Sequence, residues 1–292
     1  MKSYTHLPTN RALSKDKIYI RNREMGIQTS WPLHSHEGFE IYYFIEGVAN
    51  YIIGDNIFQL LPGDMLIFEG QTLHRVNPDT EVPYVRSYIN FLPSYLESFV
   101  PQELLDKLLS PFHNENGQLI RWGPEEKEDI DRIFANIVLE RDKEKTGYRF
   151  MMQTYVAQLL TRIYRKSKEM DPTLVVPNAS QKEMYVHRVL RYINDHYQEN
   201  LSLDQIAGSL HLNKYYMCHC FKEVTGYTIN VYLSKRRLDE AKKMLRMTDL
   251  PIGQISDQIG FNSAIHFSRL FKQHVGVSPQ TYRNMNLTNS EY

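Results

Sequence analysis

The first third of the chain is a succession of short runs rich in Tyr, Ile, Val and Phe. These runs cover residues 39–45, 49–53, 65–68 and 84–91, within a zone that extends from about residue 18 to residue 91. Turn signals separate them at residues 46–47, 54–56, 62–64 and 77–79. Several short strands at near-regular spacing with such punctuation are typical of an antiparallel sandwich or a small barrel.

The period of the apolar positions becomes helical between about residues 93 and 168. Pro124 suits the first position of a helix, and the acidic residues that follow it favour a helix N-terminus. Apolar side chains then recur at helical spacing, at Ile130, Ile133, Phe134, Ile137 and Val138. Gly147 interrupts this pattern, which resumes over residues 148–166. Two adjacent amphipathic helices either pack against the preceding barrel or form a dimer interface.

Residues 171–180 contain two prolines and show no periodicity, which is typical of a linker. Beyond them the pattern is helical apart from short turns. We therefore expect an N-terminal domain over residues 1–170, a linker over residues 171–180 and a C-terminal domain over residues 181–292. The fold class is α+β, with an antiparallel β-barrel and its helices preceding an all-α domain.

The last hundred residues contain an internal repeat. Residues 206–213 align with residues 255–262 at an offset of 49, and the Phe-Lys pair and glycine that follow align at an offset of 50. This alignment puts the one-residue slip between the asparagine and the phenylalanine of each copy. Ser202 opens the first copy with a capping-box pattern, and Pro251 starts the second. Asn213 and Asn262 are suited to cap the second helices, and glycines follow where those helices should end.

Each copy predicts a helix, a short turn and a second helix, over residues 203–224 and 252–274. Two short helices joined by a tight turn form a helix-turn-helix unit, whose second helix enters the DNA major groove. Residues 214–222 and 263–272 are then the recognition helices. Residues 229–247 predict a long helix that holds the units apart, and a separation of roughly 34 Å would match successive major grooves. The alternative is a plain helical bundle.

Composition and charge agree with a DNA-binding C-terminal part. The 292 residues are 42% hydrophobic and 23% charged, with 34 residues of each sign. From residue 181 onward Lys and Arg outnumber Asp and Glu by 14 to 10, whereas before it the acidic residues lead by 24 to 20. Two closely spaced cysteines exclude a disulfide framework. Neither a signal peptide nor a membrane-length apolar run is present in the sequence, so we expect a cytoplasmic protein with no membrane partner.

The C-terminal part resembles the AraC/XylS-type transcription regulators. The strings IGQISDQIGF (residues 252–261), HFSRLFK (266–272) and GVSPQTYR (276–283) match the signature of that family, and residues 202–241 match the first half of its domain. The resemblance covers about residues 184–283. Departures from the usual pattern occur at Asn213, at Ser256 and at residues 218–220, so the base sequence recognised is not predicted.

The resemblance implies that base contacts come from the exposed sides of the recognition helices: Lys214, Tyr215, Cys218 and His219 in the first, and Ser263, Ala264, His266 and Arg269 in the second. The guanidinium fork of Arg269 suits guanine, and Tyr215 and Ala264 suit thymine methyl groups. Asn262 either contacts DNA or only caps its helix. Lys222 and Lys272 are expected to reach phosphates or solvent. Core positions are assigned to Met217, Phe221, Phe267 and Phe271. Cys218, His219 and Cys220 are soft metal ligands, but residues two apart on a helix diverge, which argues against zinc there.

A second constellation lies in the β-type zone. His34, His36 and Glu40, with His74 further along, offer three imidazoles and one carboxylate, which suit a divalent Mn, Fe, Ni or Zn ion. Strand alternation places Tyr42 on the same face. The spacing resembles the two motifs of cupin barrels, although the second motif is imperfect at residues 69, 71 and 78. Each histidine could instead satisfy a loop hydrogen bond.

Regulators of the AraC type commonly carry a cupin-like barrel that binds a small effector, often a sugar. The resemblance therefore implies that His34, His36, Glu40, Tyr42 and His74 bind an effector, without catalysis and without a required cofactor, and with a divalent metal as an option. Tyr51 and Tyr88 add stacking faces and hydroxyls suited to a carbohydrate. We expect a homodimeric, DNA-binding regulator, an activator that contacts RNA polymerase rather than a repressor. The alternative is a metal-dependent cupin enzyme fused to a DNA-binding domain.

Overall fold

The computed structural model describes residues 8–26, 32–170 and 180–287. The chain divides into two compact units, one before Ser180 and one that begins there, and each is described by itself. Of the expected linker, residues 171–179 lie outside the described residues. Within the described ranges, no helix combines the length and the apolar character that crossing a membrane requires.

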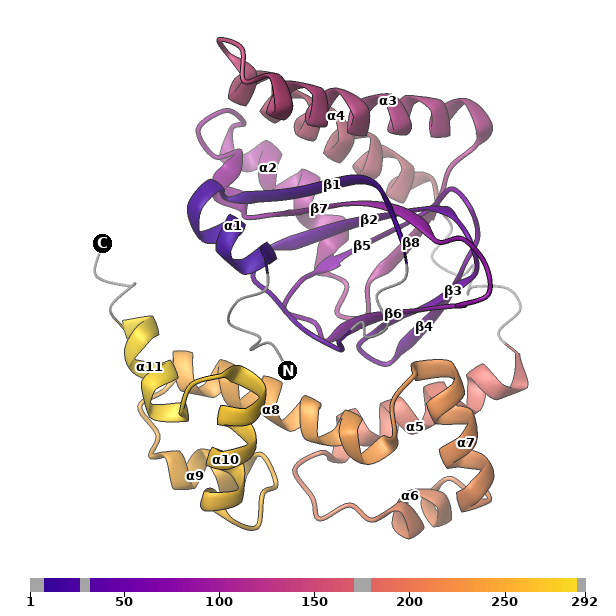
Figure 1. Cartoon of the computed structure of the whole chain (residues 1–292), viewed down its shortest axis with the longest axis vertical. Coiled ribbons are helices and arrows are strands. Elements are labelled where there is room, and N and C mark those ends of the chain that lie inside the picture. Colours follow the sequence, from indigo (N-terminus) through magenta and orange to yellow (C-terminus); the bar gives the residue numbers. More distant parts are fainter. Residues whose placement is uncertain (1–7, 27–31, 171–179, 288–292) are drawn as a thin grey trace. The chain divides into compact units, whose positions relative to one another are not determined.

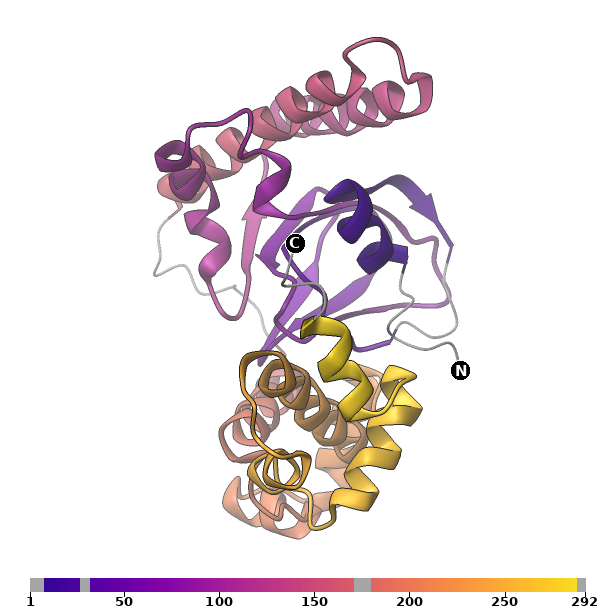
Figure 2. The same ribbon diagram turned by 90° about the vertical axis from the view of Figure 1, so that its left-hand side faces the viewer.

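The first unit is built on two antiparallel sheets, which together contain the eight strands of its described residues (Figures 1 and 2). The larger sheet has the order β1-β7-β2-β5-β8, with β1 Ile18–Met25, β7 Val85–Phe91, β2 Phe39–Glu46, β5 Asp64–Glu69 and β8 Gln118–Arg121. The smaller sheet has the order β4-β3-β6, with β4 Asn56–Leu60, β3 Ala49–Ile53 and β6 His74–Pro78. The four runs expected from the sequence are strands, so the antiparallel β-domain is confirmed.

Two expectations about these strands are wrong. Strand β8 lies inside the zone expected to be helical, where it pairs with β5 from Asp64↔Arg121 to Ile67↔Gln118. With only four residues, β8 is too short to be recognised from an alternating pattern, and its pairing with β5 is what makes this segment a strand. Strand β6 runs into the expected turn at residues 77–79, because Asn77 and Pro78 pair with Asn50 and Ala49. Pro78 is tolerated there as the last residue of an edge strand.

Strand β2 is buried on both faces over its first six residues. Tyr42 and Phe44 join the cluster between the sheets, whereas Ile41 and Tyr43 join the cluster on the opposite face. This division follows from the two-residue period of a strand. The central sheet therefore separates a barrel interior from a second core, and it needs helices to cover that second core.

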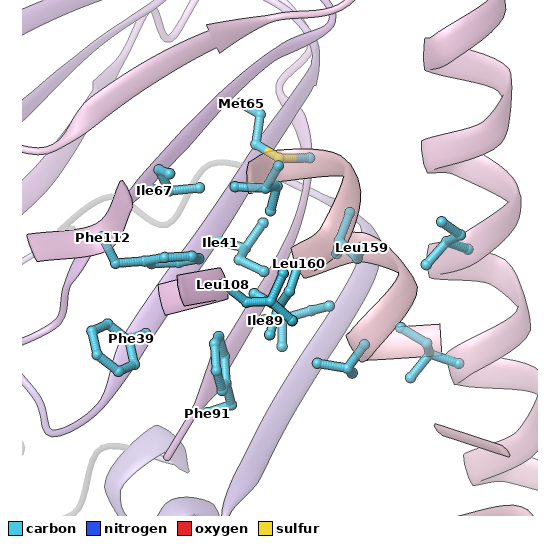
Figure 3. Packing of buried hydrophobic residues seen from close by; sticks show 14 of the residues in the cluster. Phe39, Ile41, Met65, Ile67, Ile89, Phe91, Leu108, Phe112, Leu159 and Leu160 are labelled. Carbon is cyan, nitrogen blue, oxygen red and sulfur yellow. The ribbon is translucent and has the colours of Figure 1, made fainter. Parts of the chain in front are cut away.

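Three helices supply that cover: α2 (Gln102–Leu109), α3 (Pro124–Lys143) and α4 (Tyr148–Glu169). Figure 3 shows Leu159 and Leu160 of α4 beside Ile41 and Ile89 of the sheet. Pro124 is the first residue of α3, and Gly147 caps α4 with φ +83°. The helices pack their apolar stripes on their own sheet, as one of the two alternatives predicted. The unit also contains α1 (Pro8–Asp16) and the 3₁₀ turns η2 (Pro93–Tyr95) and η3 (Ser110–His113).

The second unit is helical throughout its described residues (Figure 1). Its elements are α5 (Gln181–His196), α6 (Leu203–Ser209), α7 (Lys214–Thr225), α8 (Ile229–Met247), α9 (Ile252–Gln258), α10 (Ala264–Val275) and α11 (Pro279–Leu287). The pairs α6/α7 and α9/α10 are the two expected helix-turn-helix units, and α8 is the long helix between them. Gly226 and Gly276 end α7 and α10 in the left-handed conformation, as predicted.

The caps of the two units correct the sequence alignment by one residue. Asn213 caps α7 by accepting a hydrogen bond from the Tyr216 backbone, as predicted. In the second helix-turn-helix pair, Ser263 caps α10 by accepting a hydrogen bond from the His266 backbone, and Asn262 does not cap it. The caps are therefore 50 residues apart, while α6 and α9 begin 49 apart. The extra residue is absorbed in the turn before the cap rather than after it. Pro251 likewise occupies the cap position of α9 rather than its first helical position.

One arginine of α8 connects the loop that precedes the first helix-turn-helix unit with the turn of the second helix-turn-helix unit. The Arg237 guanidinium donates to the carbonyl oxygens of Tyr197 (2.7 Å) and Glu199 (2.6 Å), in the loop between α5 and α6. The guanidinium also lies 5.6 Å from the ring of Phe261, in the turn between α9 and α10. Gly260 in that turn approaches the same loop so closely that a Cβ atom would lie 2.5 Å from the Gln198 carbonyl oxygen. The turn between α9 and α10 therefore packs directly on the loop between α5 and α6, in addition to the connection through α8.

Candidate functional site

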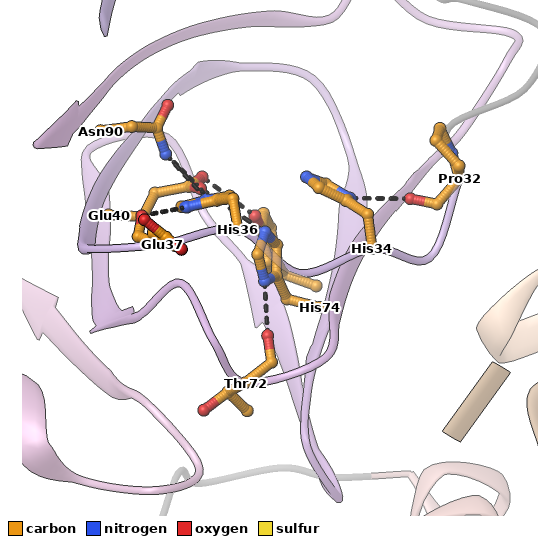
Figure 4. Close-up of polar contacts among 9 residues, drawn as sticks. Pro32, His34, His36, Glu37, Glu40, Thr72, His74 and Asn90 are labelled. Carbon is orange, nitrogen blue, oxygen red and sulfur yellow. Dashed lines mark hydrogen bonds and ion pairs between the residues drawn. The ribbon is translucent and has the colours of Figure 1, made fainter. Parts of the chain in front are cut away.

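The three histidines singled out in the sequence come together at one end of the barrel (Figure 4). His34 and His74 face each other in an isolated bridge, with backbone hydrogen bonds of 3.0 and 2.9 Å in the two directions. The His36 backbone donates to the carbonyl of Gly70, the residue after β5, at 2.8 Å, so the segment before β2 is also held against the loop between β5 and β6. One nitrogen from each of the three rings lies within 4.8 Å of the others.

The backbone fixes the orientation of all three rings. The Nδ1 atoms of His34, His36 and His74 lie 2.9, 2.9 and 2.7 Å from backbone carbonyl oxygens, which belong to residues 32, 37 and 72. A carbonyl oxygen can only accept, so each Nδ1 carries a proton and donates it. In a neutral ring, Nε2 then holds a lone pair. The backbone hydrogen bonds therefore set the tautomer of each neutral ring.

Glu40 of β2 completes the cluster from the other sheet. Its Oε2 atom lies 2.8 Å from His36 Nε2 and 3.5 Å from His74 Nε2. Burial by itself raises the pKa of Glu40, but the hydrogen bond with His36 and the nearby imidazoles outweigh it, and the pKa falls to about 2. Burial and then the neighbouring His34 lower the pKa of His74 well below that of a free histidine. At neutral pH the cluster therefore contains an anionic carboxylate and a neutral His74.

Sequence reasoning missed two partners of Glu40. Asn90 of β7 donates to Glu40 Oε2 at 2.7 Å and lies 3.0 Å from His36 Nε2, and the Tyr51 hydroxyl donates to Glu40 Oε1 at 3.2 Å. Glu40 and Asn90 are direct partners in the β2–β7 register. Only the pairing of strands fifty residues apart in sequence reveals this contact. Tyr42, expected beside the histidines, directs its hydroxyl to that of Tyr84 and packs its ring on Tyr51 at 4.6 Å.

The first expected recognition helix presents a mixed surface. Tyr215 is 84% exposed, and His219 is also exposed, whereas Lys214 and Cys218 are half-buried. Lys214 Nζ lies 2.9 Å from the Asp204 carboxylate of α6, an ion pair that salt or a phosphate can replace. The expected core residues Met217 and Phe221 are buried, and so is Cys220. Cys218 and Cys220 thus face different surroundings, and they form no metal-binding group within the described residues.

The second expected recognition helix offers a comparable surface. Arg269 and His266 are exposed, Ala264 is half-buried, and Phe267 and Phe271 are core residues as predicted. Ser263 is exposed but is committed to the helix cap.

Ile265 was missed and is 84% exposed, the same fraction as Tyr215. Each is the second residue of its helix, α10 or α7. The repeat at an offset of 50 residues could have identified this pair, because it aligns Tyr215 with Ile265. An isoleucine this exposed at the start of a helix has no role in the core.

Two family models match the chain. Residues 17–160 match a family described as "AraC-like ligand binding domain", and residues 206–285 match one described as "Helix-turn-helix domain". These ranges fall on the β-domain with its helices and on the paired helices of the second unit.

Curated relatives match over most of the chain. The Escherichia coli K12 protein described as uncharacterized HTH-type transcriptional regulator YdiP is 27% identical over 86% of this chain and 80% of its own length. The Msm operon regulatory protein of Streptococcus mutans is 24% identical over 85% and 84%. The melibiose operon regulatory protein of E. coli K12 is 24% identical over 86% and 83%. All three are named as regulators rather than as enzymes.

Proposed function

The chain belongs to the AraC family of DNA-binding transcription regulators and carries the ligand-binding domain of that family, and from this premise we propose that α7 and α10 read the bases of its operator. The observation that carries this proposal is the matched exposure of Tyr215 and Ile265 at the second position of two equivalent helices. Arg237 and Gly260 support it, because their contacts hold the second helix-turn-helix unit against the loop that leads into the first.

The exposed side chains of the two helices supply different kinds of contact. Tyr215 and Ile265 offer apolar contact to thymine methyl groups, and Arg269 offers two parallel hydrogen bonds to guanine. His219 and His266 add donors at base edges. The residues proposed for readout are Lys214, Tyr215, Cys218, His219, Ser263, Ala264, Ile265, His266 and Arg269. Asn262 is exposed and does not cap the helix, so we add its side chain to the residues proposed to contact DNA.

Arg269 and Lys272 provide a matched pair of tests on one helix, since both are exposed cations. Operator sequences are selected from a random DNA library with the full-length protein, and binding is measured by fluorescence anisotropy at fixed salt. Arg269→Ala should weaken binding to the selected operator by about 10- to 100-fold, because a bidentate base contact contributes about 1–3 kcal/mol of discrimination. Binding to random DNA should change little.

Lys272→Ala is the control for a phosphate contact. It should weaken binding to operator and random DNA alike and reduce the salt dependence by about one phosphate. Equal losses on both DNAs for Arg269→Ala would show that Arg269 contacts only the backbone, and the proposed readout would then be wrong at that position.

For the β-domain, a small carbohydrate is the proposed effector. The polar groups around Glu40 suit a ligand with several hydroxyls, and one relative is named for the melibiose operon. A panel of mono- and disaccharides is tested by thermal unfolding. The effector should raise the melting temperature in a concentration-dependent way and shift the operator affinity. A panel without any response would contradict a carbohydrate effector.

The α3–α4 pair is the proposed dimer interface. Leu139, Phe150 and Met151 are exposed apolar residues at the connected ends of these helices. In light scattering, the full-length protein should be a dimer, and Leu139→Glu with Met151→Glu should make it a monomer. Leu61→Glu, an equally exposed position elsewhere in the unit, should leave the dimer intact. A wild-type protein that stays monomeric with operator DNA would refute this assignment.

Activation through contact with RNA polymerase is the proposed mode of regulation. In vitro transcription from a promoter that carries the selected operator should increase when the regulator and its effector are present. A decrease would identify a repressor instead.

A further inference from the structure

We propose that the first unit has a second ligand site, outside the barrel, which binds a small molecule that carries a phosphate monoester. The site is a cavity of about 550 Å³ between α1, the start of β1, the segment around η2 and the connected ends of α3 and α4. Pockets for small molecules usually enclose roughly 300–1,000 Å³. The proposal goes beyond the DNA readout and the carbohydrate effector, and it depends on neither.

Backbone hydrogen bonds fix two walls of the cavity. Helix α1 ends at Asp16, and the Lys17 backbone then donates to the Leu13 carbonyl oxygen at 3.1 Å with φ +60°, which turns the chain into β1. Helix α1 therefore lies beside β1 (Figure 1). The end of α3 is held against the same strand, because Arg141 Nη1 donates to the Ile20 carbonyl oxygen at 3.1 Å. The cavity is thus a built feature of the unit.

The buried part of the lining is apolar. Ile18, Ile20 and Met152 are buried, and the half-buried rings of Tyr95 and Tyr148 lie among the same lining residues. Aliphatic side chains and aromatic rings together accept an apolar or flat organic group. A ligand that fills this cavity therefore has an organic body and is more than a bare inorganic ion.

The outer part of the lining carries an excess of positive charge. The charged lining residues are the cations Lys15, Lys17, Arg21, Arg141 and Arg149 and the carboxylates Asp16 and Glu144. Among the described residues, Lys15, Lys17, Asp16 and Glu144 form no ion pair. The two carboxylates therefore do not neutralise these cations by direct contact. A cleft lined mainly by one sign of charge attracts ligands of the opposite sign.

The cations approach the cavity from more than one side. Lys15 belongs to α1, and Arg149 belongs to α4. Arg149 Nε donates to the Tyr148 hydroxyl at 3.0 Å, so its terminal nitrogens remain for a ligand. A phosphate monoester has three terminal oxygens and a charge of about −1.5 to −2 at neutral pH. A planar carboxylate has one charge and two oxygens, so it matches this arrangement less well.

Tyr95 adds a neutral donor beside these cations. Its hydroxyl makes no hydrogen bond within the part of the chain that the structure describes. Burial raises the pKa of Tyr95 to about 12, although the charge of Arg149 acts in the opposite direction. The hydroxyl therefore keeps its proton at neutral pH. It lies close enough to Arg149 to feel its charge, so both groups can donate to one phosphate.

Phenyl phosphate is the probe, because it joins a phosphate to an apolar ring. Full-length protein is titrated by isothermal calorimetry in a phosphate-free buffer of fixed ionic strength. Inorganic phosphate, which lacks the ring, and benzoate, which has a carboxylate instead, are the comparison ligands. We expect phenyl phosphate to bind at one site per chain with a Kd at least about 10-fold lower than that of either. It should also raise the melting temperature of the first unit.

Three variants locate the binding. Arg149→Gln should weaken phenyl phosphate binding by about 10- to 100-fold, the range for loss of a charge-assisted hydrogen bond. Lys145→Gln is the matched control, because Lys145 is an exposed cation of the same connection that does not line the cavity. It should bind like the wild type. Ser98→Phe keeps every charge but fills part of the cavity, so it should weaken phenyl phosphate more than inorganic phosphate.

Each contrary result overturns the proposal. Equal losses for Arg149→Gln and Lys145→Gln would show attraction by surface charge without a site. Wild-type protein that does not bind phenyl phosphate, or that binds benzoate more tightly, would exclude a phosphate monoester. Random DNA is titrated in parallel: if Arg149→Gln weakens DNA binding and leaves phenyl phosphate binding intact, the cation serves DNA instead. The three substituted residues are exposed, so the variants should fold, and tryptophan fluorescence in urea checks this.

Discussion

Gly260 tests whether close packing of the turn between α9 and α10 on the loop between α5 and α6 contributes to the stability of the C-terminal unit. It follows α9 with φ +86°, and a Cβ atom built there would lie 2.5 Å from the Gln198 carbonyl oxygen and 2.8 Å from that of Tyr197. The loop that carries these oxygens cannot retreat easily, because Arg237 donates to the Tyr197 carbonyl at 2.7 Å. Gly260→Ala therefore forces either the turn or the loop to move.

The expected cost has two parts. A residue with a Cβ atom in the left-handed region costs about 1–2 kcal/mol. Overpacking against atoms that cannot shift adds about 1–3 kcal/mol. We expect Gly260→Ala to lower the free energy of unfolding of the second unit by about 2–5 kcal/mol, a large part of the ~5–15 kcal/mol typical of a domain. Gly253→Ala is the matched control, since nothing lies within 4 Å of its added Cβ atom. It should be neutral or stabilise α9 by up to ~1 kcal/mol.

Urea unfolding can follow the two units separately. Both tryptophans precede residue 171, so fluorescence reports the first unit, whereas far-ultraviolet circular dichroism also reports the helices of the second. Gly260→Ala should shift the dichroism transition to lower urea and leave the fluorescence transition in place. A decrease in the free energy of unfolding below about 1 kcal/mol, or one equal to that of Gly253→Ala, would refute the reasoning that the turn at Gly260 packs tightly on the loop between α5 and α6.

Three further changes have defined outcomes. Arg237→Gln should destabilise the second unit by about 1.5–3 kcal/mol, because it removes charge-assisted hydrogen bonds to carbonyl oxygens; an unchanged dichroism transition in urea would contradict this. Burial lowers the pKa of His274, so the folded chain resists a proton that the unfolded chain accepts, and stability should fall as the pH drops below about 6.5. His274→Gln should flatten that part of the curve of melting temperature against pH, and an unaltered slope would exclude this residue as its source. Leu159→Ala should cost the first unit about 2–5 kcal/mol by opening a cavity, and it should shift the tryptophan fluorescence transition to lower urea; an unshifted fluorescence transition would contradict this.

The sequence predicted helix starts and ends correctly where a single short segment contains all the residues that determine them. The capping box at Ser202, the first-turn proline at Pro124 and the helix-ending glycines Gly226 and Gly276 are in the positions predicted. Each acts through backbone conformation or through a hydrogen bond within three or four residues. The duplicated pattern of these signals was enough to predict two helix-turn-helix units and the long helix between them.

Signals that depend on register were less reliable. The choice between Asn262 and Ser263 as the cap of α10 depended on where the one extra residue of the second repeat lies, and both residues are good caps. Strand β8 has four residues, and only its pairing with β5 distinguishes it from a loop. In each case two local solutions have nearly equal energy, and the surrounding packing selects one of them.

The sequence by itself determined most of the strands and helices, the faces that are apolar and the residue types that could bind DNA or a metal ion, but not β8 or the end of β6. Tertiary structure alone decided that Asn90 lies opposite Glu40, that His74 Nε2 is buried without a hydrogen-bond partner among the described residues, and that Arg237 binds the loop between α5 and α6. The physical reason is that these contacts join segments some forty to fifty residues apart. Their geometry depends on how the sheets and helices pack as whole bodies, and no short window of sequence encodes that packing.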